Sequence, residues 1–404
     1  MSVATTTVEV GFNLLATGDQ SGKLILDDTV RGKLDDSGYV LAGPTWTDVT
    51  GYVRQVNIRR GRSNELDRYP SGQCTVTLDN RHRQFDPDYA DGDFYPYVRP
   101  RKPLRITCGT AVAFVGQVED WNLSYQVSGD AVASASGADG FALFAGQELT
   151  GFTTTGQKSG ERVAAILDRS EIGWPNAMRD IDTGEQTLQA DDVTYGTNAL
   201  QYLQTVEATE PGALFMSRDG LLTFRARTTS PTSFTDVAFD DLGTGVPFTD
   251  IAVSYGTELL YNIVTVTRVG GSAQRVDNSA STEYGISSLS RDNLLHDTDA
   301  SALQLAQWWS QIYSAPLVRF KSVTVELSGL TADQQADVLS LDLYSVASVT
   351  FNGRQSWSKI DSIDHTITPA SHRITFGLSN TASANNFVLD STQYGVLDTS
   401  RLGF

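Results

Sequence analysis

The chain has 404 residues, of which 40% are apolar, and its formal net charge is −18. This length predicts roughly two to four domains, since one ordinary core does not grow so large. The acidic balance disfavours non-specific binding to nucleic acids or membrane surfaces, although residues 51–105 hold eleven Lys and Arg against seven Asp and Glu. The first residues lack the basic and apolar segments of a signal peptide, and no apolar run approaches the ~20 residues of a membrane span.

The first predicted regions are an N-terminal arm and a β domain. Residues 1–43 form the arm, which contains the phrase ILDDTVRGKLDDSGYVL at 25–41. Between 44 and 147, short alternating or β-branched runs are separated by Gly, Pro, Asp and Asn, as is typical of sandwiches and barrels. We therefore expect a small β-barrel-like domain at 44–147. The only cysteines, Cys74 and Cys108, lie in such runs and are predicted to be core thiols rather than a disulfide.

A mixed region and a second β region follow. Residues 148–245 combine helical spacing with a hairpin signal at Asp219-Gly220, which predicts an α+β domain. Residues 246–380 return to strand-like alternation and predict a second β-barrel-like domain. This range also contains an amphipathic helix at 299–313 and a capping box at Thr331–Gln334 that opens a short helix. The expected fold class is mainly β, with two small β-barrel-like domains that flank an α+β insertion.

One phrase stands at both ends of the chain. The C-terminal arm, 381–404, ends in VLDSTQYGVLDTSRLGF at 388–404, which matches the phrase at 25–41 at seven of seventeen positions. Gly and Asp predict a turn, and the spaced leucines predict a docking arm that binds a neighbouring β domain by strand addition. Chance similarity of two turns is the alternative. The residues expected at assembly contacts are Leu26, Asp27, Thr29, Gly32, Leu34 and Asp35 in the first copy and Leu389, Asp390, Thr392, Gly395, Leu397 and Asp398 in the second.

The sequence offers little catalytic or metal-binding chemistry. Its four histidines show no metal-ligand spacing, and it contains no nucleophile elbow, phosphate loop or dinucleotide-binding glycine pattern. Asp364 and His365 are neighbours in a predicted strand and therefore point to opposite faces, which suits a catalytic pair poorly. Asp86–Asp93 resembles a calcium loop, but Ala90 stands at the fifth ligand position, so a polar turn is favoured over a calcium site. We expect no enzymatic activity, cofactor or metal.

A basic segment and an aromatic run are the remaining candidate contacts. Arg59, Arg60 and Arg62 suit a carboxylate-rich protein interface, because guanidinium groups bind carboxylates through paired hydrogen bonds. Nucleic-acid binding is disfavoured by the acidic surroundings. The run Phe94–Tyr97 is more typical of a packed strand connection than of a platform for sugars or peptides.

An ordered series of short motifs runs through residues 46–121. The motifs are Asp48-Val49-Thr50, Arg60-Gly61-Arg62, Gly72, Leu78-Asp79-Asn80, Phe85-Asp86-Pro87, Pro100-Arg101-Lys102-Pro103 and Phe114-Val115-Gly116-Gln117-Val118. This order resembles the minor tail proteins of long-tailed (siphovirus-type) actinobacteriophages. The second half is similar to baseplate hub proteins at Tyr261-Asn262, Tyr284-Gly285 and Asp364-His365.

The resemblance implies a structural virion protein with the architecture of contractile-tail hubs. Such a hub is a homotrimeric ring in which two barrels per subunit give six similar positions, so that it joins a six-fold tail tube to a three-fold tip. It also forms part of the channel for DNA ejection. The implied partners are a distal tail or tube protein, the tape measure protein and further tip proteins, with DNA only passing through the lumen and no stable membrane binding. The implied location is the tail tip or baseplate of a virion assembled in the bacterial cytoplasm.

Three other functions remain open at this point. A distal tail or adsorption protein that binds host-surface carbohydrate predicts a concave aromatic site. A tail-associated cell-wall hydrolase predicts convergent catalytic residues, for which the sequence shows no motif. An unrelated β-rich binding protein would lack both features and would not assemble into a ring.

Overall fold

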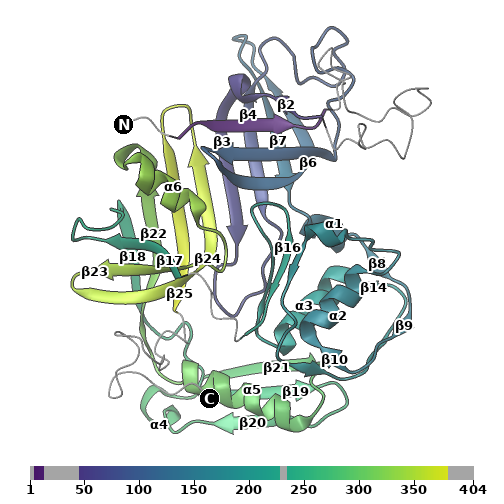
Figure 1. The fold of residues 1–404 in the computed structure, drawn as a ribbon, viewed down its shortest axis with the longest axis vertical. Coiled ribbons are helices and arrows are strands. Elements are labelled where there is room, and N and C mark those ends of the chain that lie inside the picture. Colours follow the sequence, from purple (N-terminus) through teal and green to yellow (C-terminus); the bar gives the residue numbers. More distant parts are fainter. Residues whose placement is uncertain (1–3, 13–44, 228–233, 381–404) are drawn as a thin grey trace.

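The computed structural model describes residues 4–12, 45–227 and 234–380 of the chain. Within these ranges the chain is mainly β, and its largest element is a 13-stranded sheet that runs from one β region into the other (Figure 1). Both copies of the repeated phrase lie outside the described residues. The same holds for the assembly residues expected in them, from Leu26 to Asp35 and from Leu389 to Asp398.

The first β region forms one half of the large sheet. Its strands are β1 (Thr6–Val10), β2 (Thr47–Asp48), β3 (Val53–Gly61), β4 (Gln73–Asp79), β5 (Lys102–Cys108), β6 (Ala111–Tyr125) and β7 (Ala131–Ala138). Their spatial order is β3-β4-β7-β6-β5-β1-β2. Alternate side chains are buried, and Cys74 and Cys108 are among them as free thiols. β1 falls within the predicted arm, 1–43, yet Val8 faces Ile106 of β5, because the apolar side chains of β1 complete this core.

The second β region continues the same sheet. Its elements are β17 (Phe234–Asp240), β18 (Asp250–Tyr255), β22 (Val318–Glu326), α6 (Ala332–Ser340), β23 (Val346–Phe351), β24 (Arg354–Ile367) and β25 (His372–Asn380). The spatial order is β18-β22-β25-β24, and β24 then pairs with β3, so that Ile363 lies opposite Arg60. β17 belongs to the range predicted as mixed, 148–245, but it pairs in parallel with β23. The predicted capping box at Thr331–Gln334 opens α6.

The mixed region packs beside the first β region. It contains α1 (Phe141–Ala145), β8 (Glu148–Leu149), β9 (Phe152–Thr153), β10 (Gln157–Lys158), α2 (Ser159–Leu167), β11 (Arg179–Ile181), β12 (Thr187–Leu188), β13 (Asp192–Val193), β14 (Thr197–Asn198), α3 (Ala199–Thr209), β15 (Ala213–Met216) and β16 (Leu222–Arg225). The Asp219-Gly220 turn joins β15 to β16, as the sequence predicts. Asn198 caps α3 by accepting a hydrogen bond from the backbone of Gln201.

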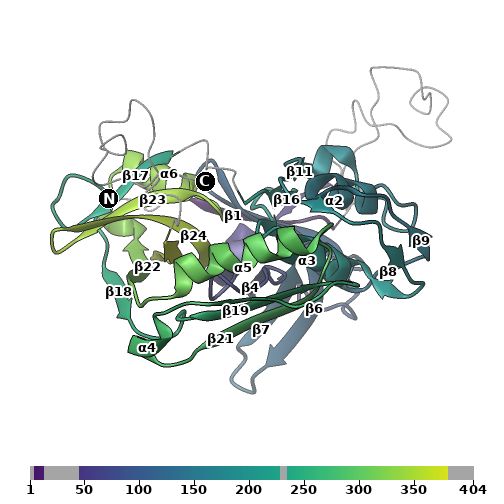
Figure 2. The ribbon, with the colours of Figure 1, turned by 90° about the horizontal axis from the view of Figure 1, so that it is seen from below.

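A small layer made mainly of one long helix and three strands has a core of its own and contacts the first β region at Leu66, just after β3. Its elements are β19 (Ile263–Arg268), β20 (Gln274–Asp277), α4 (Ser281–Tyr284), β21 (Ser288–Leu294) and α5 (Asp299–Tyr313). Figure 2 shows α5 lying along this sheet, where Leu305 and Trp309 pack against Val264 in a core of their own. The range of α5 agrees with the predicted helix. Its position differs from the prediction, which put this helix in the second β-barrel-like domain. The apolar stripe of α5 covers the small sheet instead, whereas apolar residues of α6 belong to the main core.

The expected fold class is confirmed: the chain is mainly β, with an α+β insertion between two β regions. The unexpected feature is the continuity of the sheet across both regions, which fixes their relative position through backbone hydrogen bonds.

Candidate assembly site and inter-domain joints

The predicted arginine segment lies at the joint between the two β regions. Arg60 forms an ion pair with Asp342 (Nη1 to Oδ1, 2.8 Å) and donates to the backbone carbonyl of Met216 at 2.9 Å. Arg62 forms an ion pair with Asp361 (Nη2 to Oδ1, 3.2 Å). Only 4% of the Arg60 side chain and 7% of the Arg62 side chain are exposed. These two arginines therefore bind carboxylates of the second β region of their own chain.

The pair Arg62–Asp361 is charged despite its burial. Burial raises the pKa of Asp361, but the positive charges of Arg62 and Lys359 more than offset this, and the net shift is downward. Burial lowers the pKa of Arg62, and the charge of Asp361 reverses this to a net rise. Tyr69 also donates its hydroxyl proton to Asp361 at 3.0 Å. Removal of one partner would leave the other as an unpaired buried charge.

The expectation that Arg60 and Arg62 contact another subunit is corrected by this burial. Arg59 differs, because 71% of its side chain is exposed and its Nε lies 3.8 Å from Oδ1 of Asp364, itself 43% exposed. Asp364 and His365 do point to opposite faces, as the strand pattern predicts. His365 is buried, and its Nδ1 lies 3.0 Å from Nε2 of His372.

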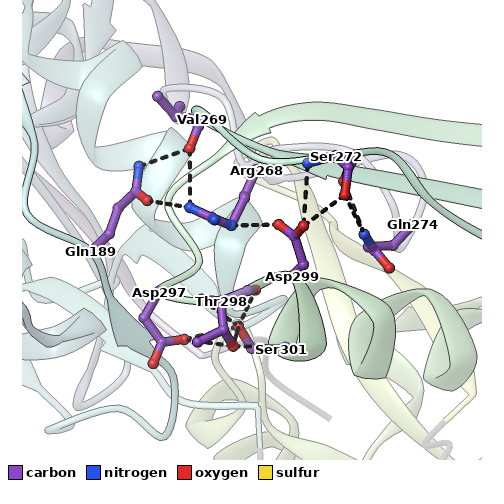
Figure 3. Close-up of polar contacts among 9 residues, drawn as sticks. All are labelled: Gln189, Arg268, Val269, Ser272, Gln274, Asp297, Thr298, Asp299 and Ser301. Carbon is purple, nitrogen blue, oxygen red and sulfur yellow. Dashed lines mark hydrogen bonds and ion pairs between the residues drawn. The ribbon is translucent and has the colours of Figure 1, made fainter.

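A second joint connects the mixed region to the α5 layer (Figure 3). Arg268 at the end of β19 donates from Nε to Oδ1 of Asp299 at 2.6 Å and from Nη1 to Oε1 of Gln189 at 3.0 Å. Gln189 in turn donates to the carbonyl of Val269 at 3.2 Å. Asp299 opens α5, and hydrogen bonds from Ser272 and Arg268 lower its pKa. Asp299 belongs to the layer itself, so its ion pair orients Arg268, and the bonds with Gln189 are the ones that cross the joint. The arrangement is partly solvated, since 22% of the Arg268 side chain and 37% of the Asp299 side chain are exposed.

One end of the large sheet is an exposed apolar edge. β18 is the terminal strand, and among the described residues it pairs only with β22. Val253 and Tyr255 of β18 are 47% and 68% exposed, and the adjoining Leu317 and Val318 are 44% and 36% exposed. An unpaired strand edge of this kind is a template for pairing with another chain. At the other end of the sheet, the terminal strand β2 is short and pairs with β1 through only two residue pairs, so most of the outer edge of β1 has no partner strand among the described residues.

The other predicted contacts are used inside the chain. Phe94 is buried and stacks on Phe12 with a ring-centroid distance of 4.9 Å, so the aromatic run at 94–97 contributes to the core. Asp86 accepts hydrogen bonds from Arg83 (2.7 Å) and Tyr125 (2.8 Å), which satisfy its carboxylate in a polar turn. Across the ranges 4–12, 45–227 and 234–380, no group of three or more His, Cys, Asp or Glu residues is arranged to hold a metal ion. No helix in these ranges has the length and apolar content to cross a bilayer.

Known proteins resemble this chain in fold rather than in sequence. No protein family model matches it, and neither does any curated protein. Among solved structures, the 43 kDa tail protein of prophage MuSo2 from Shewanella oneidensis is similar with a TM-score of 0.58 at 16% identity, over 84% of this chain and 96% of that one. A tail protein from Neisseria meningitidis MC58 also has a TM-score of 0.58, at 11% identity, over 84% of this chain and 95% of that one. The chain thus has a fold found in tail proteins.

The exposed edge at β18 is the candidate site that sequence reasoning missed. The sequence predicts no more than a strand at Ile251–Tyr255, within the alternating range 246–380, because alternation of side chains does not tell an edge strand from a central one. The run Val253-Ser254-Tyr255 is a weak signal at most. Whether this segment lies at an edge of the sheet depends on which strands pair with it, and its partner β22 lies more than 60 residues further along the chain.

Proposed function

We propose that the protein is a structural subunit of a phage tail and acts as the hub of the tail tip or baseplate. The observation that carries this proposal is the open sheet, which ends in an apolar edge at β18 and a sparsely covered edge at β1–β2. The likeness in fold to two tail proteins along most of their length supports it. The protein would act by binding and shape rather than by catalysis.

The two different ends of the sheet favour a ring. When β18 of one subunit meets the β1–β2 end of the next, the contact is head-to-tail, and such contacts close into a ring when the rotation allows. We propose a homotrimer, in which the two β regions of each subunit give six similar positions. A permanent ring of this kind requires interfaces of about 2,000 Å² or more, and the exposed side chains beside β18 supply an apolar part of that area.

The finer assignment follows the sequence resemblance. We propose a siphovirus-type tail of an actinobacteriophage, in which this ring joins the six-fold tube to a three-fold tip and lines part of the DNA channel. Its partners would be the distal tail or tube protein, the tape measure protein and further tip proteins. The terminal phrases around Leu34 and Leu397 remain predicted docking arms. With a net charge of −18, an acidic lumen would limit adhesion of passing DNA, and a lumen lined mainly by Lys and Arg would contradict this.

A matched pair of variants tests the ring. Val253→Lys places a charge on the β18 edge, whereas Val127→Lys places one on a fully exposed valine in the β6–β7 hairpin. We expect the wild type and Val127→Lys to sediment as a ring and Val253→Lys to shift to the monomer, with unchanged thermal stability in all three. A wild type that stays monomeric at all concentrations, or a Val253→Lys variant that assembles normally, would contradict the proposal.

A further inference from the structure

A pocket of about 60 Å³ lies where the end of β3 approaches β18, β22 and β25. Charged and polar side chains from these elements and from the loop after β18 line it: Arg62, Glu65, Glu258, Arg319, Lys321 and Ser379. The rim reaches solvent, because Lys321 and Glu258 form an ion pair there and are 44% and 49% exposed. A volume of this size holds a few water molecules or one small polar group.

Arg319 is the unusual residue of this pocket. It is 9% exposed, and its Nε has no hydrogen-bond partner among the described residues. It also takes part in none of the ion pairs formed within the described ranges, unlike its neighbours Arg62 and Lys321. Nε of Arg62, on the same pocket, likewise lacks a partner in the described part of the chain. A buried N–H without an acceptor is costly, so the unpartnered Nε atoms of these two arginines favour an acceptor from outside the chain.

The carboxyl groups that line the pocket do not pair with Arg319 in the described part of the chain. Glu65 lines the same pocket and interacts electrostatically with Arg319, but the two form no ion pair. Burial and the negative charge of Asp361 raise the pKa of Glu65. Asp361 is already shared by Arg62 and Tyr69. Both of these bonds go to Oδ1 of Asp361, and its Oδ2 has no hydrogen-bond partner among the described residues. Neither carboxyl group forms an ion pair with Arg319 within the described ranges.

We propose that this pocket is an anion site that takes one carboxylate group against Arg319. The planar guanidinium presents paired donors that match the two oxygens of a carboxylate, whereas Lys321 at the rim is already paired with Glu258. The pocket has room for the carboxylate and little more. Two sources share this chemistry: a free small carboxylate, and an Asp or Glu side chain of a second copy that docks beside β18, whose Ser254 also lines the pocket. The second source rests on the ring proposed above, and the first does not.

Acetate is the probe for the site itself. Thermal unfolding of the full chain at neutral pH is followed in sodium acetate and in sodium chloride of equal ionic strength, and the dissociation constant is fitted from the concentration dependence. We expect acetate to raise the melting temperature more than chloride does. Arg319→Met should weaken acetate binding about tenfold or more, which corresponds to the loss of a charge-assisted hydrogen bond. Glu65→Gln removes the competing carboxyl group and should tighten acetate binding.

The control is Arg81→Met, which removes an equal charge at a side chain that is 60% exposed and far from the pocket in the sheet. It should leave the acetate effect unchanged. Arg319→Met should also retain or increase the stability of the isolated chain, since it replaces a buried charge that has no partner by an apolar side chain. A structural arginine would behave in the opposite way.

Sedimentation of the same variants identifies the source of the carboxylate. If Arg319→Met stays folded but no longer assembles, while Arg81→Met assembles, the carboxylate belongs to a second copy, and acetate should then disperse the wild-type assembly. If assembly is unchanged and only the acetate effect is lost, the ligand is a free carboxylate. The proposal is overturned if acetate and chloride act alike and assembly is unaffected. It is equally overturned if Arg319→Met and Glu65→Gln destabilise the chain to the same extent without an acetate effect, because the two residues would then be an internal pair.

Discussion

Two joints hold the parts of this chain together, and they treat charge differently. At the joint between the β regions, β24 pairs with β3, and the ion pairs of Arg60 and Arg62 are buried beneath the shared sheet. At the joint with the α5 layer, Gln189 accepts a hydrogen bond from Arg268 and donates one to Val269, and no strand of the large sheet crosses it. The ion pair that holds Arg268 in place, with Asp299 of the same layer, is partly solvated. Removal of one partner of a buried ion pair lowers the free energy of unfolding strongly, whereas removal of one partner of an exposed pair lowers it little.

This difference indicates that the β regions form one rigid body and that the α5 layer is the part able to adjust. For a tail hub, a fixed angle between the two β regions would keep six similar positions in register. The following variants test that contrast, from the largest expected effect to the smallest.

Arg62→Met should have the largest effect, since it leaves Asp361 as a buried charge without its main partner. We expect a loss of about 3–5 kcal/mol in the free energy of unfolding, measured by urea denaturation. The double variant Arg62→Met/Asp361→Leu should recover most of this loss, because neither charge then remains. If Arg62→Met alone lowers the free energy of unfolding by less than about 1 kcal/mol, this buried joint is energetically no different from the exposed one, and the contrast is contradicted.

Gly61→Ala should weaken the same joint by a steric route. Gly61 has φ +96°, and a Cβ there would lie 2.1 Å from the carbonyl oxygen of Asp361 in β24. We expect a loss of about 3 kcal/mol from backbone strain and the forced separation of the strands. The matched control is Gly129→Ala, which has φ +91° but no atom within 4 Å of the added Cβ and should lose only about 1 kcal/mol. Equal losses in the two variants would show that the close approach of β3 and β24 has no energetic weight.

The pH dependence of stability should reveal two buried titratable groups, His372 in β25 and Glu207 in α3. Burial lowers the pKa of His372 to about 4 from 6.5, so stability is present above pH 6.5 and is lost, by up to about 3 kcal/mol, as the pH falls toward 4. Burial raises the pKa of Glu207 to about 7 from 4.5, so its contribution is present below pH 4.5 and is lost as the pH rises toward 7. Unfolding measured between pH 4 and 8 should therefore show a maximum at intermediate pH. His372→Gln should make the acid side less steep, while His296, whose pKa burial also lowers to about 4, keeps part of the loss. An unchanged acid limb would contradict this assignment.

Arg268→Met should have the smallest effect. Its ion pair with Asp299 is partly exposed, so the global free energy of unfolding should fall by less than about 1 kcal/mol. Hydrogen exchange should nevertheless become faster in β21 and in the first turn of α5, because the layer is less firmly attached. A global loss as large as that of Arg62→Met would remove the contrast between the joints.

The sequence predicted those features whose causes are local. The helix at 299–313, the capping box at Thr331 and the hairpin at Asp219-Gly220 depend on neighbouring residues, and each forms where expected. The mainly β class followed from side-chain alternation, which is also a local property.

The joints and the site could not be predicted in this way. β3 and β24 are about 300 residues apart in the chain, so nothing near Arg62 reveals that Asp361 is its partner. The arginines were expected to bind carboxylates, which they do, but burial within one chain and exposure toward another subunit give the same sequence pattern. The edge position of β18 and the lack of a partner for Arg319 likewise depend on the completed fold.

The central claim is that this chain is a structural part of a tail tip. It is tested most directly by electron microscopy of intact phage particles that carry the chain, labelled with an antibody raised against it. We predict label at the distal end of the tail, at the tip or baseplate, on particles of normal length. Label on the capsid or along the tail tube, or no label on particles at all, would contradict the account.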